Sequence, residues 1–284
     1  MKTVILGGGG QLAFDLAREM GSGVHSLSHQ DLDLCDYDAV WERLEDLKPE
    51  RVINTAAVTD VDRCEREVEK AFQVHAAGVL NLARVCRDLD CTLVQISTDY
   101  VFGGGQDRPY REEDPPDPLN VYGASKLAGE YFARHYAEQS FVVRTAGLFG
   151  IGGAEGEGGN FVEAVLRSAK GGKPLRVVED QITSPTYTRH LAAALRRLLS
   201  SGRCGVYHLT NQGQCSWYQF AEEILQREQL TADLQPISSS NLSRAASRPG
   251  YSVLDSGKAA RVLGGELPAW QDGLADYLDE RNTL

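Results

Sequence analysis

The regular alternation of short apolar runs with longer helical segments constrains the fold of this chain more than any other feature of its sequence. Such alternation is typical of a parallel sheet whose strands are connected by crossover helices. In the first helical segment Leu12, Leu16 and Met20 repeat every four residues, which places them on one helix face. The pattern predicts strands at residues 3–6, 24–27, 51–54, 92–97, 141–144, 175–178 and 206–209.

The length of 284 residues suffices for one large α/β domain, with or without a smaller lobe, and for a core that needs no disulfides. Residues 151–159 are rich in Gly and Glu, which predicts a loop. We therefore expect a doubly wound parallel sheet in residues 1–150 and a smaller lobe in residues 151–284. A segment at about 175–209 is expected to return to the sheet.

The charge and the cysteines limit the classes of partner and compartment. A net charge of -11 disfavours binding to nucleic acid or to an anionic membrane, and we find no basic patch that would offset it. The six cysteines form no Cys-x-x-Cys pair, which is typical of free thiols in a reducing compartment. No apolar run approaches the ~18 residues of a membrane span, and the apolar run at residues 1–7 is too short for a signal peptide. We expect a cytoplasmic protein.

A glycine loop, Gly7-Gly8-Gly9-Gly10-Gln11-Leu12-Ala13, follows the first predicted strand directly and opens a helix. A dinucleotide pyrophosphate requires such a tight turn, close access to backbone N–H groups, and the positive end of a helix dipole. The spacing differs from the Gly-x-Gly-x-x-Gly form, so its position at the first strand–helix junction carries the interpretation. The loop predicts that the doubly wound sheet is a Rossmann domain with Gly7 and Gly10 at the cofactor.

The end of the second predicted strand bears on the choice of cofactor. It reads Leu27-Ser28-His29, and the first carboxylate is Asp31. A carboxylate at the strand end would bind the ribose 2′-hydroxyl of NAD and repel a 2′-phosphate. Its absence favours NADPH, with NADH as the alternative donor if Asp31 reaches the ribose.

Two sequence patterns indicate carbonyl chemistry. Tyr122 and Lys126 are spaced i, i+4 and so share a helix face, where the ammonium would lower the pKa of the phenol and ready it for proton transfer. Thr98 follows the fourth predicted strand, at the edge where parallel sheets bind ligands. A hydroxyl and an acidified phenol together can bind a carbonyl oxygen and stabilise the alkoxide formed when hydride arrives. Taken alone, this spacing would fit equally well a helix in which Tyr122 is buried in the core and Lys126 is solvated, without a catalytic role.

These motifs resemble those of the extended short-chain dehydrogenase/reductases and, within them, the dTDP-4-dehydrorhamnose reductase family. The resemblance runs almost end to end and is carried by residues 97–102 (STDYVF), 120–130 (NVYGASKLAGE), 144–145 (RT) and 180–186 (DQITSPT). It implies NADPH-dependent reduction of the 4-keto group of dTDP-4-dehydro-L-rhamnose to dTDP-L-rhamnose, a step of nucleotide-sugar biosynthesis for cell-wall polysaccharide.

The resemblance also implies roles for individual residues. Tyr122 would donate the proton, Lys126 would bind the nicotinamide ribose, and Thr98 would hold the keto oxygen. The pyrophosphate and adenosine would lie on Gly10, Gln11 and Leu12, the adenine edge on Asp33 and Leu34, and the inner ribose on Ala56, Ala57, Val58 and Thr59. Asp99, Asn160 and Arg248 are the candidate substrate contacts, although Arg248 would equally suit a surface ion pair.

The chain departs from the family pattern at two positions. Gly147 stands where many members have a Trp that would face the sugar, so we expect a remodelled sugar pocket. His75 replaces the usual Asn, and we interpret it as a buried polar contact. No metal site is predicted, and the sequence does not decide whether Mg²⁺ is required or whether the chain forms a homodimer.

Two other functions remain open at this point. One is a nucleotide-sugar epimerase or dehydratase that keeps NAD tightly bound and uses the same Thr, Tyr and Lys chemistry. The other is a non-catalytic, NADP-binding regulatory subunit similar to the methionine adenosyltransferase beta subunit.

Overall fold

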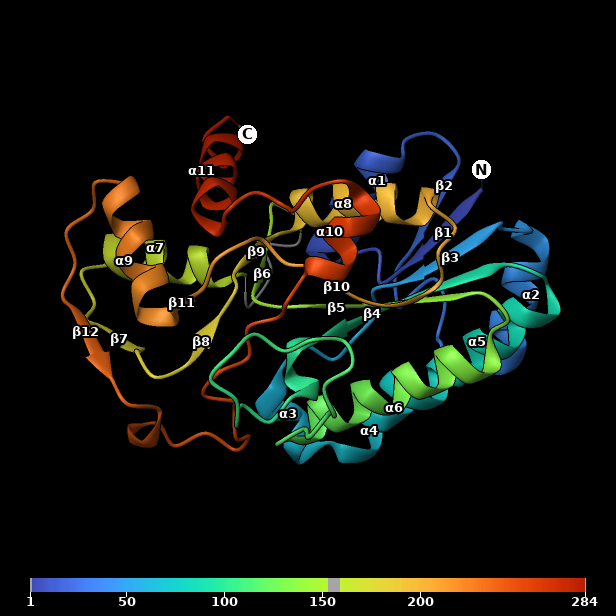
Figure 1. Cartoon of the computed structure of the whole chain (residues 1–284), viewed down its shortest axis with the longest axis horizontal. Helices are drawn as coiled ribbons and strands as arrows, with labels where there is room; N and C mark the ends of the chain where they lie inside the picture. Colours follow the sequence, from blue (N-terminus) through green and yellow to red (C-terminus); the bar gives the residue numbers. More distant parts are fainter. Residues whose placement is uncertain (1, 153–158, 284) are drawn as a thin grey trace.

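The computed structural model describes residues 2–152 and 159–283, so most of the loop predicted at 151–159 lies outside the described residues. The described chain forms a sheet-containing lobe and a smaller lobe beside it (Figure 1). No helix in the described part of the chain is long and apolar enough to cross a lipid bilayer.

A six-stranded sheet forms the centre of the larger lobe. Its order is β10-β5-β4-β3-β1-β2, and every neighbouring pair is parallel. The predicted doubly wound α/β fold is therefore confirmed, because chain order reverses beside β1 and helices cover both faces. The strands are β1 (Thr3–Leu6), β2 (Val24–Leu27), β3 (Arg51–Asn54), β4 (Thr92–Thr98), β5 (Ser140–Thr145) and β10 (Gly205–His208).

Neighbouring residues of each strand enter different cores, as expected of side chains that alternate across a sheet. Ile5 packs with α1 (Gln11–Met20), α8 (Thr188–Ser200) and α10 (Gly257–Leu263), whereas Val4 packs toward the opposite layer. That layer contains α2 (Tyr37–Leu47), α5 (Gly78–Asp88) and α6 (Val121–Tyr136), and Figure 1 shows the two layers on either side of the sheet. A run of α3 (Val61–Arg66), α4 (Val68–Phe72) and the π-helical turn η1 (Gln73–Ala77) leads into α5.

The smaller lobe has its own core, in which the aromatic rings of Phe149, Phe220 and Tyr277 pack together. Helices α7 (Phe161–Lys170), α9 (Trp217–Arg227) and α11 (Trp270–Arg281) surround it. Two-stranded pairings complete the lobe and its junction with the sheet: β7 (Leu175–Val178) with β12 (Leu234–Ile237), β8 (Ile182–Thr183) with β11 (Cys215–Ser216), and β6 (Leu148–Phe149) with β9 (Thr186–Tyr187).

The expectation that residues 175–209 return to the central sheet is wrong at its start. β7 pairs with β12 outside that sheet, and its Leu175 and Val177 pack in the core of the smaller lobe. The chain returns through α8 and β10. An apolar run predicts a strand, but the sheet that the strand joins depends on which core buries its side chains.

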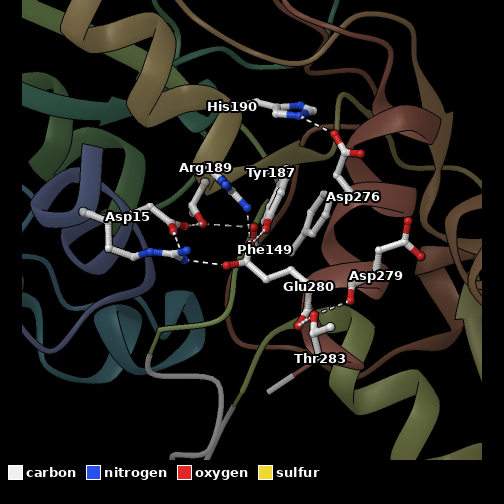
Figure 2. A network of polar contacts seen from close by, with 11 residues as sticks. Asp15, Phe149, Tyr187, Arg189, His190, Asp276, Asp279, Glu280 and Thr283 are labelled. Atoms are coloured by element: carbon white, nitrogen blue, oxygen red, sulfur yellow. Dashed lines mark hydrogen bonds and ion pairs between the residues drawn. The ribbon is translucent and has the colours of Figure 1, made fainter. Parts of the chain in front are cut away.

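A polar network joins α11 to the sheet lobe (Figure 2). The Glu280 carboxylate of α11 accepts hydrogen bonds from Arg18 of α1, from Arg189 of α8 at 3.2 Å, and from the Tyr187 hydroxyl. Beside it, the Thr188 hydroxyl donates to Asp15 at 2.5 Å. The network fixes the smaller lobe against the face of α1 and α8.

Candidate active site

Helix α6 begins where its first turn can approach the end of β4. Asn120 caps the helix, accepting from the Gly123 N–H at 2.8 Å and donating from its own amide to the Ser247 carbonyl at 2.7 Å. A Cβ at Gly123 would lie 2.1 Å from the Tyr100 carbonyl oxygen, so only glycine permits this approach. The cap and the glycine together place Tyr122 beside the turn η2 (Asp99–Val101) that follows β4.

Thr98, Asp99 and Tyr122 line one cavity. The Thr98 hydroxyl donates to the Asp99 carboxylate at 3.1 Å and accepts from the Tyr100 N–H at 3.1 Å. The Ser252 hydroxyl donates to the other Asp99 oxygen at 2.5 Å. Burial raises the pKa of Asp99 to about 6, although these hydrogen bonds favour the carboxylate. The structure thus brings Thr98 and Tyr122 to the same cavity, and their catalytic roles stay predictions.

The acidity of the phenol differs from the expectation. Burial, and next the negative charge of Asp99, raise the pKa of Tyr122 above its ordinary value. The Lys126 ammonium donates instead to the Ile96 carbonyl at 2.6 Å and interacts with the charge of Glu130. Burial lowers the pKa of Lys126 to about 8, with Glu130 acting in the opposite direction. The predicted lowering of the phenol pKa is therefore wrong for this structure, and the phenol is held in its protonated form.

The glycine loop adopts the geometry that a bound pyrophosphate requires. Gly7 has φ +84°, and a Cβ there would lie 2.7 Å from the Thr55 hydroxyl oxygen and 2.8 Å from the Ala56 nitrogen. The Gly10 N–H bonds to the Gly7 carbonyl at 2.9 Å, and Gly10 caps α1 with extended backbone. The positive end of α1 therefore opens toward the carboxyl ends of the strands.

Two large cavities of about 690 and 640 Å³ lie over these strand ends and share Ala57 and Thr59. Every predicted cofactor residue lines at least one of them. The first is bordered by Gly7, Asp33, Leu34, Ala56 and Val58, and the second by Gly10, Gln11, Leu12, Tyr122 and Lys126. A third cavity of about 180 Å³ extends from Thr98, Asp99 and Tyr122 toward the smaller lobe.

Comparisons with known proteins agree with this geometry. The family model described as RmlD substrate binding domain matches residues 1–283. The dTDP-4-dehydrorhamnose reductase of Mycolicibacterium smegmatis is 38% identical over 97% of this chain and 84% of its own length. The chain belongs to the dTDP-4-dehydrorhamnose reductase family.

Two further proteins are similar to this chain over nearly their whole length. The spore coat polysaccharide biosynthesis protein SpsK of Bacillus subtilis is 38% identical over 99% of this chain and 98% of its own. The crystal structure of dTDP-4-dehydrorhamnose reductase from Bacillus anthracis in complex with NADP superposes with a TM-score of 0.93 at 35% identity, covering 99% of this chain and 100% of that one. The resemblance drawn from the motifs is confirmed.

Two predicted substrate contacts of this family member have structural partners. Asn160 lines the second cavity, caps α7 by accepting from the Glu163 N–H at 3.0 Å, and donates to the Gly150 carbonyl at 3.0 Å. Arg248 lines none of the three cavities and pairs with Asp62 of α3 at 2.7 Å. A substrate contact by either residue stays a prediction.

The wall of the third cavity comes largely from residues to which the sequence analysis assigned no role. Residues 181–183 lie within the motif at residues 180–186, but nothing in the spacing of these residues or of Trp217 indicates that they meet Thr98. Only the folding of the smaller lobe onto the sheet brings them there. These wall residues are Val61, Tyr100, Gln181, Ile182, Thr183, Trp217, Pro249 and Ser252.

Gly147, where we expect a remodelled sugar pocket, lines both the second and the third cavity. Gly147 has φ +53°, a left-handed conformation that favours glycine. A Cβ there would lie 3.2 Å from Pro185 and 3.6 Å from the indole of Trp217. Trp217 of the smaller lobe therefore supplies aromatic surface to the same cavity.

A buried ion pair lies beneath the site. Arg144 of β5 donates to the two Glu130 oxygens at 2.9 and 2.7 Å, and Ser97 donates to the first of them at 2.5 Å. Both charged side chains are less than 5% exposed.

Within residues 2–152 and 159–283, no three His, Cys, Asp or Glu side chains are grouped so that they could hold a metal ion.

Proposed function

We propose that this chain reduces the 4-keto group of dTDP-4-dehydro-L-rhamnose to dTDP-L-rhamnose with NADPH. The observation that carries the proposal is the placement of Thr98, Tyr122 and Lys126 on one cavity that also reaches the glycine loop. Family membership supports it, because the similar proteins of M. smegmatis and B. anthracis bear that enzyme name.

The acid in this reaction would be Tyr122. Its pKa is raised by burial and by Asp99, so the phenol carries a proton that it can donate to an alkoxide oxygen. Thr98 faces the same space and would hold that oxygen beside the phenol. Lys126, anchored on the Ile96 carbonyl, would place its positive charge at the nicotinamide ribose. The bound cofactor would supply the hydride.

Preference for NADPH over NADH follows from how Asp31 is held. Its carboxylate accepts from both the N–H and the hydroxyl of Ser28 at 2.7 Å, which ties it to its own turn at the end of β2. His29, Arg63 and Lys70 line the cavity beside the end of that strand. The positive charges of Arg63 and Lys70 would attract a 2′-phosphate.

We propose further that residues 1–150 bind the cofactor and that residues 151–284 mainly bind the nucleotide sugar, with the segment that returns to the sheet excepted. The third cavity lies between Thr98 and Trp217 and would receive the keto sugar. Asp99 would line the sugar site, and Asn160 and Arg248 would contact the nucleotide. We propose that the enzyme is cytoplasmic. A measurement of its size in solution tests whether it forms a homodimer, and an assay with a chelator tests whether it needs Mg²⁺.

The test is turnover of NADPH with dTDP-4-dehydrorhamnose and identification of dTDP-rhamnose as the product. Tyr122→Phe should retain NADPH binding and lose about 10²- to 10⁴-fold in kcat, the usual effect of losing a general acid. Tyr131→Phe changes an exposed tyrosine of the same helix and should leave turnover unchanged. Native turnover by Tyr122→Phe would refute the assignment of the acid.

Two other outcomes would replace the proposal. Protein that carries tightly bound NAD and interconverts nucleotide sugars without net oxidation of NADPH would be an epimerase or dehydratase. Protein that binds NADPH but reduces no nucleotide 4-keto sugar would be a regulatory subunit.

A further inference from the structure

His75 lies at a junction between the cofactor segment and the helix that carries Tyr122. It occupies the π-helical turn η1 and is only 1% exposed. Its Nε2 accepts from the Val58 N–H at 2.8 Å, and its Nδ1 lies 2.8 Å from the Ser125 hydroxyl oxygen. Ser125 in turn donates to the Tyr122 carbonyl at 2.9 Å. One imidazole therefore bridges the segment that follows β3 and helix α6.

The direction of each hydrogen bond follows from the donors available. A backbone N–H can only donate, so Nε2 must be unprotonated and the single proton of the neutral imidazole must lie on Nδ1. Nδ1–H then donates to Ser125, whose own proton is directed to the Tyr122 carbonyl. Burial, and next the charge of Lys126, lower the pKa of His75 to about 3, which keeps the ring neutral.

The packing around His75 leaves little freedom for the ring. A Cβ at Gly129 would lie 2.1 Å from the His75 carbonyl oxygen, so α6 passes directly over the π-helical turn. The Tyr122 ring meets the imidazole edge-on with centroids 5.5 Å apart. π-helical turns within helices occur often at functional sites. A displacement of His75 would therefore move both Val58 and Tyr122.

We propose that His75 is a positioning residue that couples the cofactor-binding segment at Val58 to Tyr122 through a single neutral tautomer. The inference rests on the proposed function in one respect only, namely that Tyr122 is the acid. The Val58 bond holds the wall of the 690 Å³ cavity, and the Ser125 bond holds the first turn of α6. The two halves of the bridge should therefore affect cofactor affinity and turnover separately.

The experiment separates the two bonds with conservative variants. His75→Gln places an amide oxygen near the position of Nε2 and keeps the Val58 bond, whereas His75→Asn places an amide nitrogen near Nδ1 and keeps the Ser125 bond. We expect His75→Gln to bind NADPH within about twofold of native but to lose about tenfold in kcat, as Ser125→Ala also should. His75→Asn should weaken NADPH binding about tenfold and lose less in kcat.

NADPH affinity is measured by fluorescence titration, which needs no sugar turnover, and the tautomer by nitrogen NMR of the labelled native protein. His190→Gln, a substitution on α8 beside Asp276, should change neither NADPH affinity nor kcat. The proposal would be overturned if NMR placed the proton on Nε2. It would also be overturned if both His75→Gln and His75→Asn matched the native protein in NADPH affinity and kcat. If the native protein binds NADPH but reduces no sugar, the proposed function fails while the tautomer and the affinities still test His75.

Discussion

Removal of the Glu130 carboxylate should destabilise the protein more than removal of any exposed carboxylate. Glu130 accepts two hydrogen bonds from Arg144 and one from Ser97, and both ionic side chains are less than 5% exposed. Glu130→Ala leaves the Arg144 guanidinium buried, with His208 at 3.4 Å and the Phe102 ring as its other neighbours. Breaking a buried pair in this way typically costs about 3–5 kcal/mol.

That loss would be a large part of the ~5–15 kcal/mol that stabilises a typical domain. The assay is urea unfolding followed by tryptophan fluorescence, with the free energy of unfolding extrapolated to water. Glu223→Ala is the matched control, because Glu223 pairs with Arg227 at 2.6 Å on α9 with both side chains about a quarter to a third exposed. A pair of this kind contributes only ~0.3–0.5 kcal/mol.

The double variant Glu130→Leu, Arg144→Met tests the cause of the loss. If the cost comes from an uncompensated buried charge, removal of both charges should restore much of the stability that Glu130→Ala loses. A loss for Glu130→Ala no greater than that for Glu223→Ala would refute the reasoning. So would a double variant less stable than the single one, because the pair itself would then supply net stability.

Three further predictions follow from single contacts. Gly129→Ala should lose about 1–3 kcal/mol of unfolding free energy, since its Cβ would lie 2.1 Å from the His75 carbonyl oxygen, whereas Gly105→Ala, with no atom within 4 Å, should lose none of this. Because the folded pKa of Asp99 is raised from 3.8 to about 6, its contribution to stability is present below pH 4 and is lost as pH rises through 6; unfolding of Asp99→Asn should lack this change. Arg248→Ala should raise KM for the nucleotide sugar while sparing NADPH; equal effects of Asp62→Asn would indicate a purely structural ion pair.

Local features of this protein are readable in its sequence because they depend on neighbours along the chain. The apolar run at residues 3–6, the glycines at 7–10 and the i, i+4 pair of Tyr122 and Lys126 predict a strand, a cofactor loop and one helix face. Parallel strands carry their carboxyl ends to one edge, so the meeting of Thr98 with the glycine loop is also predictable. Two of the motifs that indicate the family, at residues 97–102 and 120–130, include Thr98 and the Tyr122 and Lys126 pair.

The tertiary structure decided what depends on contacts between distant segments. Burial and Asp99 raise the pKa of Tyr122, although the sequence places Lys126 one turn away, because desolvation is set by the whole surrounding fold. β7 lies outside the central sheet because its side chains are buried in the smaller lobe. Trp217 lines the Thr98 cavity only because that lobe packs against the sheet lobe. In the sequence, His75 is visible only as a replacement for the usual Asn of the family pattern. Its bonds to Val58 and Ser125 exist because two separate crossover segments pack at one strand edge.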